Sequence, residues 1–315
     1  MEISNSSKVL LAGHTGFLGG AIYECLKRNN YRNIITLTRE EVDLSDNEGT
    51  LRLINERKPE VVINAAGLSG GVEFNQNNPA TLALKNLLIQ NSIFQAVTRV
   101  SSISRVVYIG SSCMYPRFNN KPMDESFLFS GKLEETSFAY SMAKLSGVSV
   151  AQSINNQMTD CSVMTVIPSG VYGPGDNFDP RSSHVVAALI RKFYNAKKND
   201  LNEVVLYGDG SPVRQFIYVK DVADFIVFSL TNRQASKEIF NIGDKFGISI
   251  SDLAELIKEE VKYKGQIRWD TSKPNGAPYK VLSTIKSEKL GWFPSTPFAE
   301  GLKETVQFFS SSRQV

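Results

Sequence analysis

A glycine-rich segment between an apolar run and a helical stretch constrains this chain more than any other feature. Residues 9–12 read Val-Leu-Leu-Ala, and residues 13–19 read Gly-His-Thr-Gly-Phe-Leu-Gly. The helical pattern that follows ends at the turn pair Asn29-Asn30. Glycine lets the backbone approach a pyrophosphate, and the first N–H groups of a helix bind its charge. A strand, a GxxGxxG loop and a helix therefore predict a dinucleotide site. Its loop residues are Gly13, Thr15, Gly16, Phe17, Leu18 and Gly19.

Further apolar runs alternate with helical segments along the first half of the chain. The runs are residues 34–37, 61–63, 106–109 and 163–167, and the helical segments are 48–57 and 79–100. Continuous apolar runs are typical of strands buried on both faces, which belong to parallel sheets. The alternation predicts the α/β class, with a Rossmann-type doubly wound parallel sheet.

The texture of the sequence changes near residue 170, where a smaller lobe is expected to begin. We expect residues 1–170 to form the cofactor-binding domain and residues 171–315 to form mainly an α/β lobe that binds the substrate. Residues 221–230 resemble another helix that covers the first sheet. We therefore expect residues 215–242 to return to the first domain.

Composition excludes several classes of protein. The 35 Lys and Arg against 32 Asp and Glu leave a net charge of +3, too small for a nucleic-acid partner but compatible with a small phosphorylated ligand. No apolar run reaches the roughly 18 residues of a membrane span. Cys25, Cys113 and Cys161 form no CxxC pair, and the two histidines, His14 and His184, are far apart. We expect no metal and no disulfide, and a reducing, cytoplasmic location.

The end of the second predicted strand bears on the choice of cofactor. An acidic residue there would bind the ribose of NAD, whereas a basic residue would accept the extra phosphate of NADP. This chain has Arg39, which either pairs with that phosphate or is only a solubilising surface charge. We favour NADP(H). Asp43 and Leu44 are expected to border the adenine, and Asn64, Ala65 and Ala66 to line the cofactor after the third strand.

Three residues carry the predicted chemistry. Tyr140 and Lys144 are four residues apart in a helical stretch, so both project from one face. About thirty residues earlier, a predicted strand ends beside Ser111. A phenol can pass a proton, an ammonium favours the phenolate, and a hydroxyl can hold a carbonyl. Behind a glycine loop, these types indicate reduction of a ketone, although a surface Tyr and Lys on a helix would give the same spacing.

With these residues, the sequence resembles the extended short-chain dehydrogenases/reductases, and among them the GDP-L-fucose synthase family. The resemblance extends from the glycine loop to residue 292. Its most specific segments are residues 110–116 (Gly-Ser-Ser-Cys-Met-Tyr-Pro), 140–144 (Tyr-Ser-Met-Ala-Lys), 172–178 (Tyr-Gly-Pro-Gly-Asp-Asn-Phe), 183–185 (Ser-His-Val) and 273–280 (Lys-Pro-Asn-Gly-Ala-Pro-Tyr-Lys).

The resemblance implies an NADPH-dependent enzyme that reduces the C4 ketone of a GDP-4-keto-6-deoxy sugar after C3 and C5 epimerisation. Ser111, Tyr140 and Lys144 match the reductase residues, and Cys113 and His184 match the two groups that epimerise. A buried cysteine or a lone histidine is more often structural, so these two roles depend on the resemblance. The implied substrate-binding residues are Ser112, Asn177, Lys192, Tyr207, Arg214 and Lys280, and Pro168 and Val171 complete the cofactor site.

Departures from the family pattern leave the sugar open. The segment 67–75, which is implied to border the sugar, is one residue longer than usual. Pro168-Ser169-Gly170 replaces a Pro-Thr-Asn, and Thr15 stands where an arginine is common. A reductase without epimerase activity, acting on a relative such as a GDP-linked 6-deoxy-4-keto-heptose, is the main alternative.

Three other functions are less compatible with the residues. A 4,6-dehydratase would have Thr-Asp-Glu where this chain has Ser112-Cys113-Met114. A C4 epimerase that retains NAD is disfavoured by Arg39, and a non-enzymatic NADP sensor is disfavoured by the intact Ser111, Tyr140 and Lys144.

The segment 79–100 has more apolar positions than one sheet-facing stripe requires. They are Leu82, Leu84, Leu87, Leu88, Ile89, Ile93 and Phe94. With the helix of Tyr140, this segment is expected to form the four-helix interface of a homodimer, as the resemblance implies.

Overall fold

A computed structural model describes residues 3–117, 119–273 and 275–311. Pro274 of the quoted segment 273–280 and the end of the predicted second lobe, residues 312–315, lie outside them. Six parallel strands form the central sheet in the order β10-β5-β4-β3-β1-β2. They are β1 (Val9–Ala12), β2 (Ile34–Thr36), β3 (Val61–Asn64), β4 (Arg105–Ile109), β5 (Ser162–Pro168) and β10 (Ile239–Ile242). This sheet confirms the expected doubly wound α/β fold.

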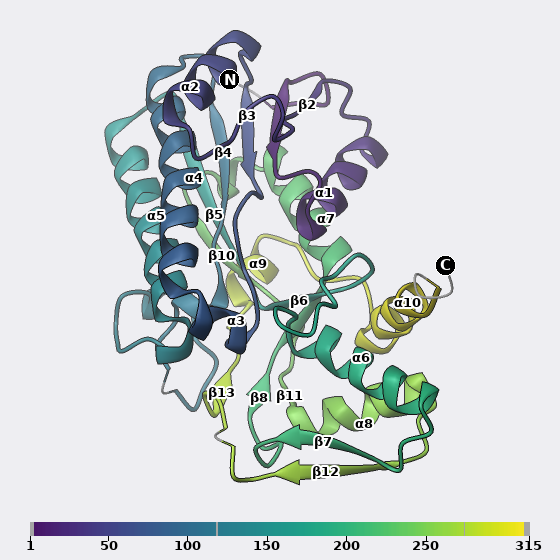
Figure 1. Ribbon diagram of the computed structural model, residues 1–315. Helices are drawn as coiled ribbons and strands as arrows, with labels where there is room; N and C mark the ends of the chain where they lie inside the picture. Colours follow the sequence, from purple (N-terminus) through teal and green to yellow (C-terminus); the bar gives the residue numbers. More distant parts are fainter. Residues whose placement is uncertain (1–2, 118, 274, 312–315) are drawn as a thin grey trace.

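Helices cover both faces of the sheet (Figure 1). One face carries α2 (Asn47–Arg57), α4 (Pro79–Arg99) and α5 (Phe138–Gln157), and the other carries α1 (Phe17–Arg28) and α7 (Val219–Thr231). Strands β1, β3, β4 and β5 are buried along their whole length because neighbouring residues alternate between the two cores. Leu10 belongs to the first core and Leu11 to the second.

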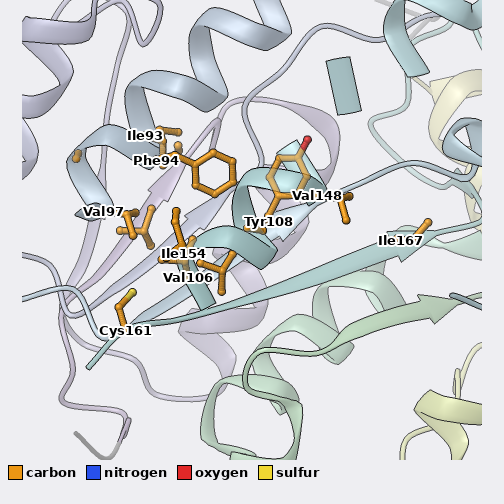
Figure 2. Packing of buried hydrophobic residues seen from close by; sticks show 14 of the residues in the cluster. Ile93, Phe94, Val97, Val106, Tyr108, Val148, Ile154, Cys161 and Ile167 are labelled. Atoms are coloured by element: carbon orange, nitrogen blue, oxygen red, sulfur yellow. The ribbon is translucent and has the colours of Figure 1, made fainter. Parts of the chain in front are cut away.

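The core beneath α4 and α5 fixes the helix that carries Tyr140 and Lys144. Figure 2 shows Phe94 of α4 beside Tyr108 of β4, and the two ring centroids lie 5.4 Å apart. The Tyr108 hydroxyl oxygen lies 2.8 Å from Gln90 Oε1 and 3.1 Å from the Lys144 carbonyl oxygen, and its one proton is shared between these two acceptors. Gln90 in turn donates to the Ala143 carbonyl. These buried bonds fix the position of α5 on the sheet.

A smaller lobe lies below the carboxyl ends of the strands (Figure 1). Its strands are β6 (Gly170–Tyr172), β7 (Glu203–Tyr207), β8 (Val213–Arg214), β9 (Phe216–Tyr218), β11 (Ile248–Ser249), β12 (Gln266–Asp270) and β13 (Tyr279–Lys280). Its main helices are α6 (Val185–Lys198), α8 (Ile250–Val261) and α10 (Phe298–Ser311), which share a core with β7 and β9. The short helices are α3 (Val72–Asn77) and α9 (Ile285–Lys289), which packs against β10.

The chain returns to the first domain through α7 and β10. Strand β10 pairs in parallel with β5 at the edge of the central sheet, although about 70 residues separate them. We propose a lobe boundary near residue 170. Of the expected return segment, residues 215–242, we assign β9 to the smaller lobe, whose core holds Phe216 and Tyr218, and α7 and β10 to the cofactor domain. Between β1 and β3 the order of the strands reverses, so the loops that follow these two strands separate and leave a crevice.

Candidate active site

The glycine loop follows the carboxyl end of β1, and two of its glycines have no room for a side chain. Gly13 has a φ of +85°, and a Cβ on it would lie 2.7 Å from the Ala66 backbone nitrogen. A Cβ on Gly19 would collide with the Gly13 carbonyl oxygen. Both glycines are therefore required for the loop to pack between β3 and α1.

Gly16 caps α1, and its backbone leaves the helix start open to an anion. No side chain caps this end, and no acidic residue occupies the first turn. His14 Nδ1 is buried beside the loop and has no hydrogen-bond partner among the described residues. Free N–H groups at a helix start fit a pyrophosphate. Thr15 and Gly16 are exposed, while Phe17 and Leu18 are partly buried.

A cavity of about 460 Å³ lies beside this loop. Thr15, Gly16 and Phe17 line one side, and Pro174, Gly175 and Lys220 line the other. Loop 173–175 follows β6, so a segment that comes after β6 faces the glycine loop and the start of α1 across this cavity.

The residues predicted for the adenosine end lie along the ends of β2 and β3. Arg39 is exposed in the turn after β2, and no ion pair joins it to another described residue. Asp43 accepts from Ser45 and lies 3.5 Å from Lys85 Nζ, so its carboxylate is already paired. Leu44 packs against the core. Asn64 ends β3, where its Oδ1 accepts from the Ala66 N–H at 3.2 Å and shapes the turn through Ala65.

Pro168 and Val171 lie on the other side of the crevice. Pro168 ends β5 opposite Ile242, and Val171 is half-buried in β6. They stand at the carboxyl end of the sheet, where the predicted cofactor residues of β1 and β3 also lie.

Ser111, Tyr140 and Lys144 come together where β4 ends beside α5. The Ser111 Oγ accepts from the Cys113 N–H at 3.2 Å and caps a short turn, residues 112–114. Lys144 is buried; its Nζ donates to the Ile109 carbonyl at 3.0 Å and lies 5.3 Å from the Tyr108 ring centroid. Tyr140 is one turn before Lys144 on α5.

Burial acts in opposite directions on the pKa values of these two groups. It lowers the pKa of the Lys144 ammonium to about 8. It raises the pKa of the Tyr140 phenol, and the nearby Cys113 raises it further, while a hydrogen bond with Ser111 opposes both effects. Tyr140 therefore holds its proton in the free protein and can donate it to a ligand.

Cys113 lies half-buried between the reductase residues and the second lobe. Its charge would interact with Tyr140 on one side and with Arg214 on the other. Burial lowers the pKa of the Arg214 guanidinium, and Cys113 and Glu134 work against that effect. Arg214 and Cys113 are about 100 residues apart in sequence, so the interaction depends on the packing of the two lobes.

His184 caps the start of α6 in the second lobe. Its ring remains accessible, yet the surrounding protein displaces enough water to lower the pKa of the imidazole. The residue two positions earlier bonds to the first domain, because the Gly71 N–H donates to the Ser182 carbonyl at 2.9 Å. A contact between the two lobes therefore lies two residues before His184 in the chain.

The predicted substrate residues form two pairs in the second lobe. Lys192 Nζ lies 5.1 Å and Lys273 Nζ lies 5.9 Å from the Tyr207 ring centroid, and Tyr207 is 66% exposed. Arg214 of β8 and Lys280 of β13 occupy matched positions on paired parallel strands. Two cations side by side suit a diphosphate.

The two remaining predicted substrate residues, Ser112 and Asn177, differ in their surroundings. Ser112 is half-buried in the turn of Cys113. The Asn177 amide donates to Ser182 Oγ at 2.8 Å, and its oxygen accepts from the Asp179 N–H. Asn177 thus maintains the turn before His184 in this structure.

Sequence reasoning missed the residues that hold the loop after β3. Asn86 of α4 accepts from the Leu68 N–H and donates to the Leu68 carbonyl, and a Cβ on Gly67 would lie 3.7 Å from Lys144 Nζ. Asn75 bonds the same loop further along. The signal available in the sequence was the presence of Asn75 and Asn86 near a glycine-rich segment, because a side-chain amide can bond the polar groups of an irregular backbone.

The described residues contain no group of three or more His, Cys, Asp or Glu side chains able to hold a metal. None of the helices within residues 3–311 is both long and apolar enough to cross a membrane.

The fold and this site define an enzyme that uses a nicotinamide dinucleotide, with a Ser-Tyr-Lys set at the crevice. The family model described as NAD dependent epimerase/dehydratase matches residues 9–243. The chain belongs to that family, and within it to the group that contains the GDP-L-fucose synthases.

Individual relatives agree with this assignment. The chain is 38% identical over 302 residues to a probable GDP-L-fucose synthase 1 of Oryza sativa subsp. japonica, covering 96% of this chain and 92% of the relative. A GDP-6-OMe-4-keto-L-xylo-heptose reductase from C. jejuni has a TM-score of 0.90 at 27% identity, covering 99% and 100% of the two chains. A GDP-L-fucose synthetase of Naegleria fowleri bound to NADP has a TM-score of 0.89 at 28% identity, covering 100% and 96%.

Proposed function

We propose that this chain reduces the C4 ketone of a GDP-4-keto-6-deoxy sugar with NADPH, after epimerisation at C3 and C5. The observation that carries the proposal is the adjacency of Ser111 and Cys113 in one turn beside Tyr140. A ketone held by Ser111 and Tyr140 would place its neighbouring carbon-bound protons near the Cys113 thiol.

The reduction follows from the protonation of the two buried groups. Bound NADPH would supply the hydride to C4. Tyr140 would donate its proton to the C4 oxygen, and the Lys144 ammonium would stabilise the phenolate that remains. The Ser111 hydroxyl would donate to the same oxygen and orient the carbonyl. The product is an alcohol, with one hydride and one proton added.

Epimerisation needs a base and an acid on opposite faces of the sugar. The C4 ketone acidifies the protons on C3 and C5. One of Cys113 and His184 would remove such a proton, and the other would return a proton to the opposite face. Cys113 belongs to the first domain and His184 to the second, so a sugar in the crevice would meet one from each side.

The cofactor and nucleotide assignments rest on separate residues. Arg39 supports NADP, because it is an exposed cation in the turn that follows β2. Tyr207 would stack on the guanine base, and Arg214 and Lys280 would bind the diphosphate.

A reductase that acts on a GDP-4-keto-heptose without epimerising it is the second candidate. It is favoured by the likeness to the C. jejuni heptose reductase and by the extra residue in the segment 67–75, which is implied to border the sugar.

One incubation separates the two candidates. The protein, NADPH and GDP-4-keto-6-deoxymannose would be mixed in D₂O, and the product sugar identified by NMR and mass spectrometry. Deuterium at C3 and C5 of a reduced, inverted sugar supports the proposal. Reduction without deuterium indicates a reductase alone. No consumption of NADPH contradicts the first candidate, and the same incubation with a GDP-4-keto-heptose then tests the second. Tyr140→Phe is the control for enzyme-dependent reduction.

We also propose a homodimer formed through α4 and α5. Their outer surface exposes Leu84 and Leu88 of α4 and Phe138 and Met142 of α5. A cytoplasmic location is proposed because Cys25, Cys113 and Cys161 are all unpaired.

A further inference from the structure

The loop after β3 connects the two halves of the site. Its first part lies against α4, where Asn86 holds both polar backbone groups of Leu68 beside Lys144. Its last part, Gly70 and Gly71, leads into α3. We name residues 67–71 the bridging loop. Helix α3 packs against residues 135–137, directly before the helix of Tyr140.

Asn75 fixes the end of the bridging loop. It is buried on α3, and its Nδ2 donates to the Gly70 carbonyl at 2.6 Å and to the Gly71 carbonyl at 2.9 Å. These two bonds set the direction in which the Gly71 N–H points. That N–H donates across the lobes to the Ser182 carbonyl at 2.9 Å.

The contact at Gly71 is too close for any other residue. A Cβ on Gly71 would collide with the Ser183 carbonyl oxygen. Gly71 has a φ of −67°, so its backbone conformation suits other residues and the restriction is one of space. The turn on the other side is rigid by itself, because the Ser183 N–H donates to the Asp179 carbonyl and Asn177 bonds Ser182. His184 comes next in the chain.

From these contacts we propose that Asn75 and Gly71 are positioning residues for His184, and that the bridging loop sets the place of His184 relative to Cys113. The catalytic part of this inference rests on the proposed epimerisation. Neither residue touches the reacting atoms in this scheme, and both act through Ser182 and Ser183.

The test compares matched variants. Asn75→Ala removes both amide bonds, whereas Asn77→Ala makes the same change at an exposed position of the same helix. Gly71→Ala disturbs the contact from the backbone side and gives a second, independent variant if Asn75→Ala is too unstable. Each variant is first checked for NADPH binding, which reports the folded first domain.

The main measurement does not depend on turnover. The chain has only two histidines, so labelled histidine gives one resonance for His184 and one for His14, and His184→Asn assigns them. In Asn75→Ala and Gly71→Ala we expect the His184 resonance to shift while His14 and NADPH affinity stay unchanged. Asn77→Ala should match wild type.

The second measurement is exchange of solvent deuterium into the keto sugar. A displacement of about 1 Å in a catalytic group lowers a rate by about 10²-fold, and we expect a loss of that order in both variants. An unmoved His184 resonance in both variants would overturn the inference. So would a shifted resonance with undiminished exchange. If wild-type protein shows no exchange, the proposed epimerisation fails, and the His184 resonance alone decides whether the bridging loop positions this residue.

Discussion

Lys280 and Arg214 lie opposite each other on β13 and β8, two parallel strands of two residues each. Side chains at matched positions of paired strands project from the same face of the sheet. Both residues are half-buried, and the Arg214 Nη1 also donates to the Val213 carbonyl, which restricts the guanidinium. The pair therefore places two cations on one face of this small sheet, and the guanidinium of Arg214 is restrained.

The first prediction concerns this pair. Arg214→Ala should weaken binding of GDP by about 10- to 100-fold, because a charge-assisted hydrogen bond contributes about 1.5–3 kcal/mol. Lys280→Ala should weaken it less, because an ammonium bonds a phosphate without the bidentate geometry of a guanidinium. Calorimetric titration with GDP and with GMP measures this. GMP, which has no second phosphate, should lose less affinity. Equal affinity of wild type and the double variant for GDP would contradict the assignment.

The second prediction concerns pH and Lys144. Its pKa of about 8 in the free protein means that the ammonium loses its proton as pH rises through that value. Tyr140, whose pKa burial raises, keeps its proton there but loses the positive charge that stabilises its phenolate. We expect kcat/KM to fall above about pH 8. In Lys144→Arg, which stays charged, this decline should be absent even if the rate is lower. A wild-type profile that is flat to pH 9.5 would contradict it.

The same pKa has a consequence for stability. The folded pKa is below the ordinary value of 10.5, so between about pH 8 and pH 10.5 the unfolded chain binds the additional proton. The contribution of Lys144 is therefore unfavourable below pH 8 and is relieved as pH rises, by roughly 1.4 kcal/mol for each unit of pKa shift. Lys144→Met should be more stable than wild type at pH 7, and the difference should shrink toward pH 10.5. Urea unfolding of both proteins at several pH values measures it.

The third prediction concerns Arg39. If its guanidinium binds the additional phosphate of NADPH, Arg39→Ala should reduce the preference for NADPH over NADH by about 10- to 100-fold. Arg32→Ala, an exposed arginine just before β2, is the matched control and should leave the ratio unchanged. The measurement is kcat/KM for each cofactor. An unchanged ratio in Arg39→Ala would remove this residue from the site.

The fourth prediction concerns the outer surface of α4 and α5. Leu84 is 60% exposed and Leu88 is 48% exposed, one turn apart on α4. Replacing both with Glu should convert a dimer into a monomer of 34.9 kDa, measured by light scattering. Leu201→Glu introduces a charge at another exposed leucine and should leave the mass unchanged. A wild-type mass near 35 kDa at micromolar concentration would contradict the proposed dimer.

The sequence was sufficient for the elements that depend on local patterns. Strands such as β4 and β5 consist mostly of apolar residues, and both faces of each are indeed buried. The glycine loop was predictable because its spacing, strand and helix agree. Tyr140 and Lys144 were predictable because helical geometry alone places them on one face.

The rest depends on contacts between distant segments. Strands β8 and β13 have two residues each and pair over more than 60 residues, so no local pattern marks them. The six residues of α3 have no apolar repeat, and Asn75 holds that helix to the loop before it. The link from Gly71 to Ser182 follows from close packing between lobes, which periodicity does not encode.

The last prediction separates the two chemical steps. Tyr140→Phe removes the proton donor and should lower reduction by about 10²- to 10⁴-fold, as expected for the loss of a positioned acid. Cys113 and His184 remain in that variant, so solvent deuterium should still enter C3 or C5 of the keto sugar. Cys113→Ser keeps a similar shape but replaces the thiol with a far weaker acid, so that exchange should stop while NADPH binding persists. Mass spectrometry of the recovered sugar and NADPH fluorescence give the two readouts. Loss of exchange in Tyr140→Phe would show that both steps need this residue, and normal exchange in Cys113→Ser would show that epimerisation does not need the thiol.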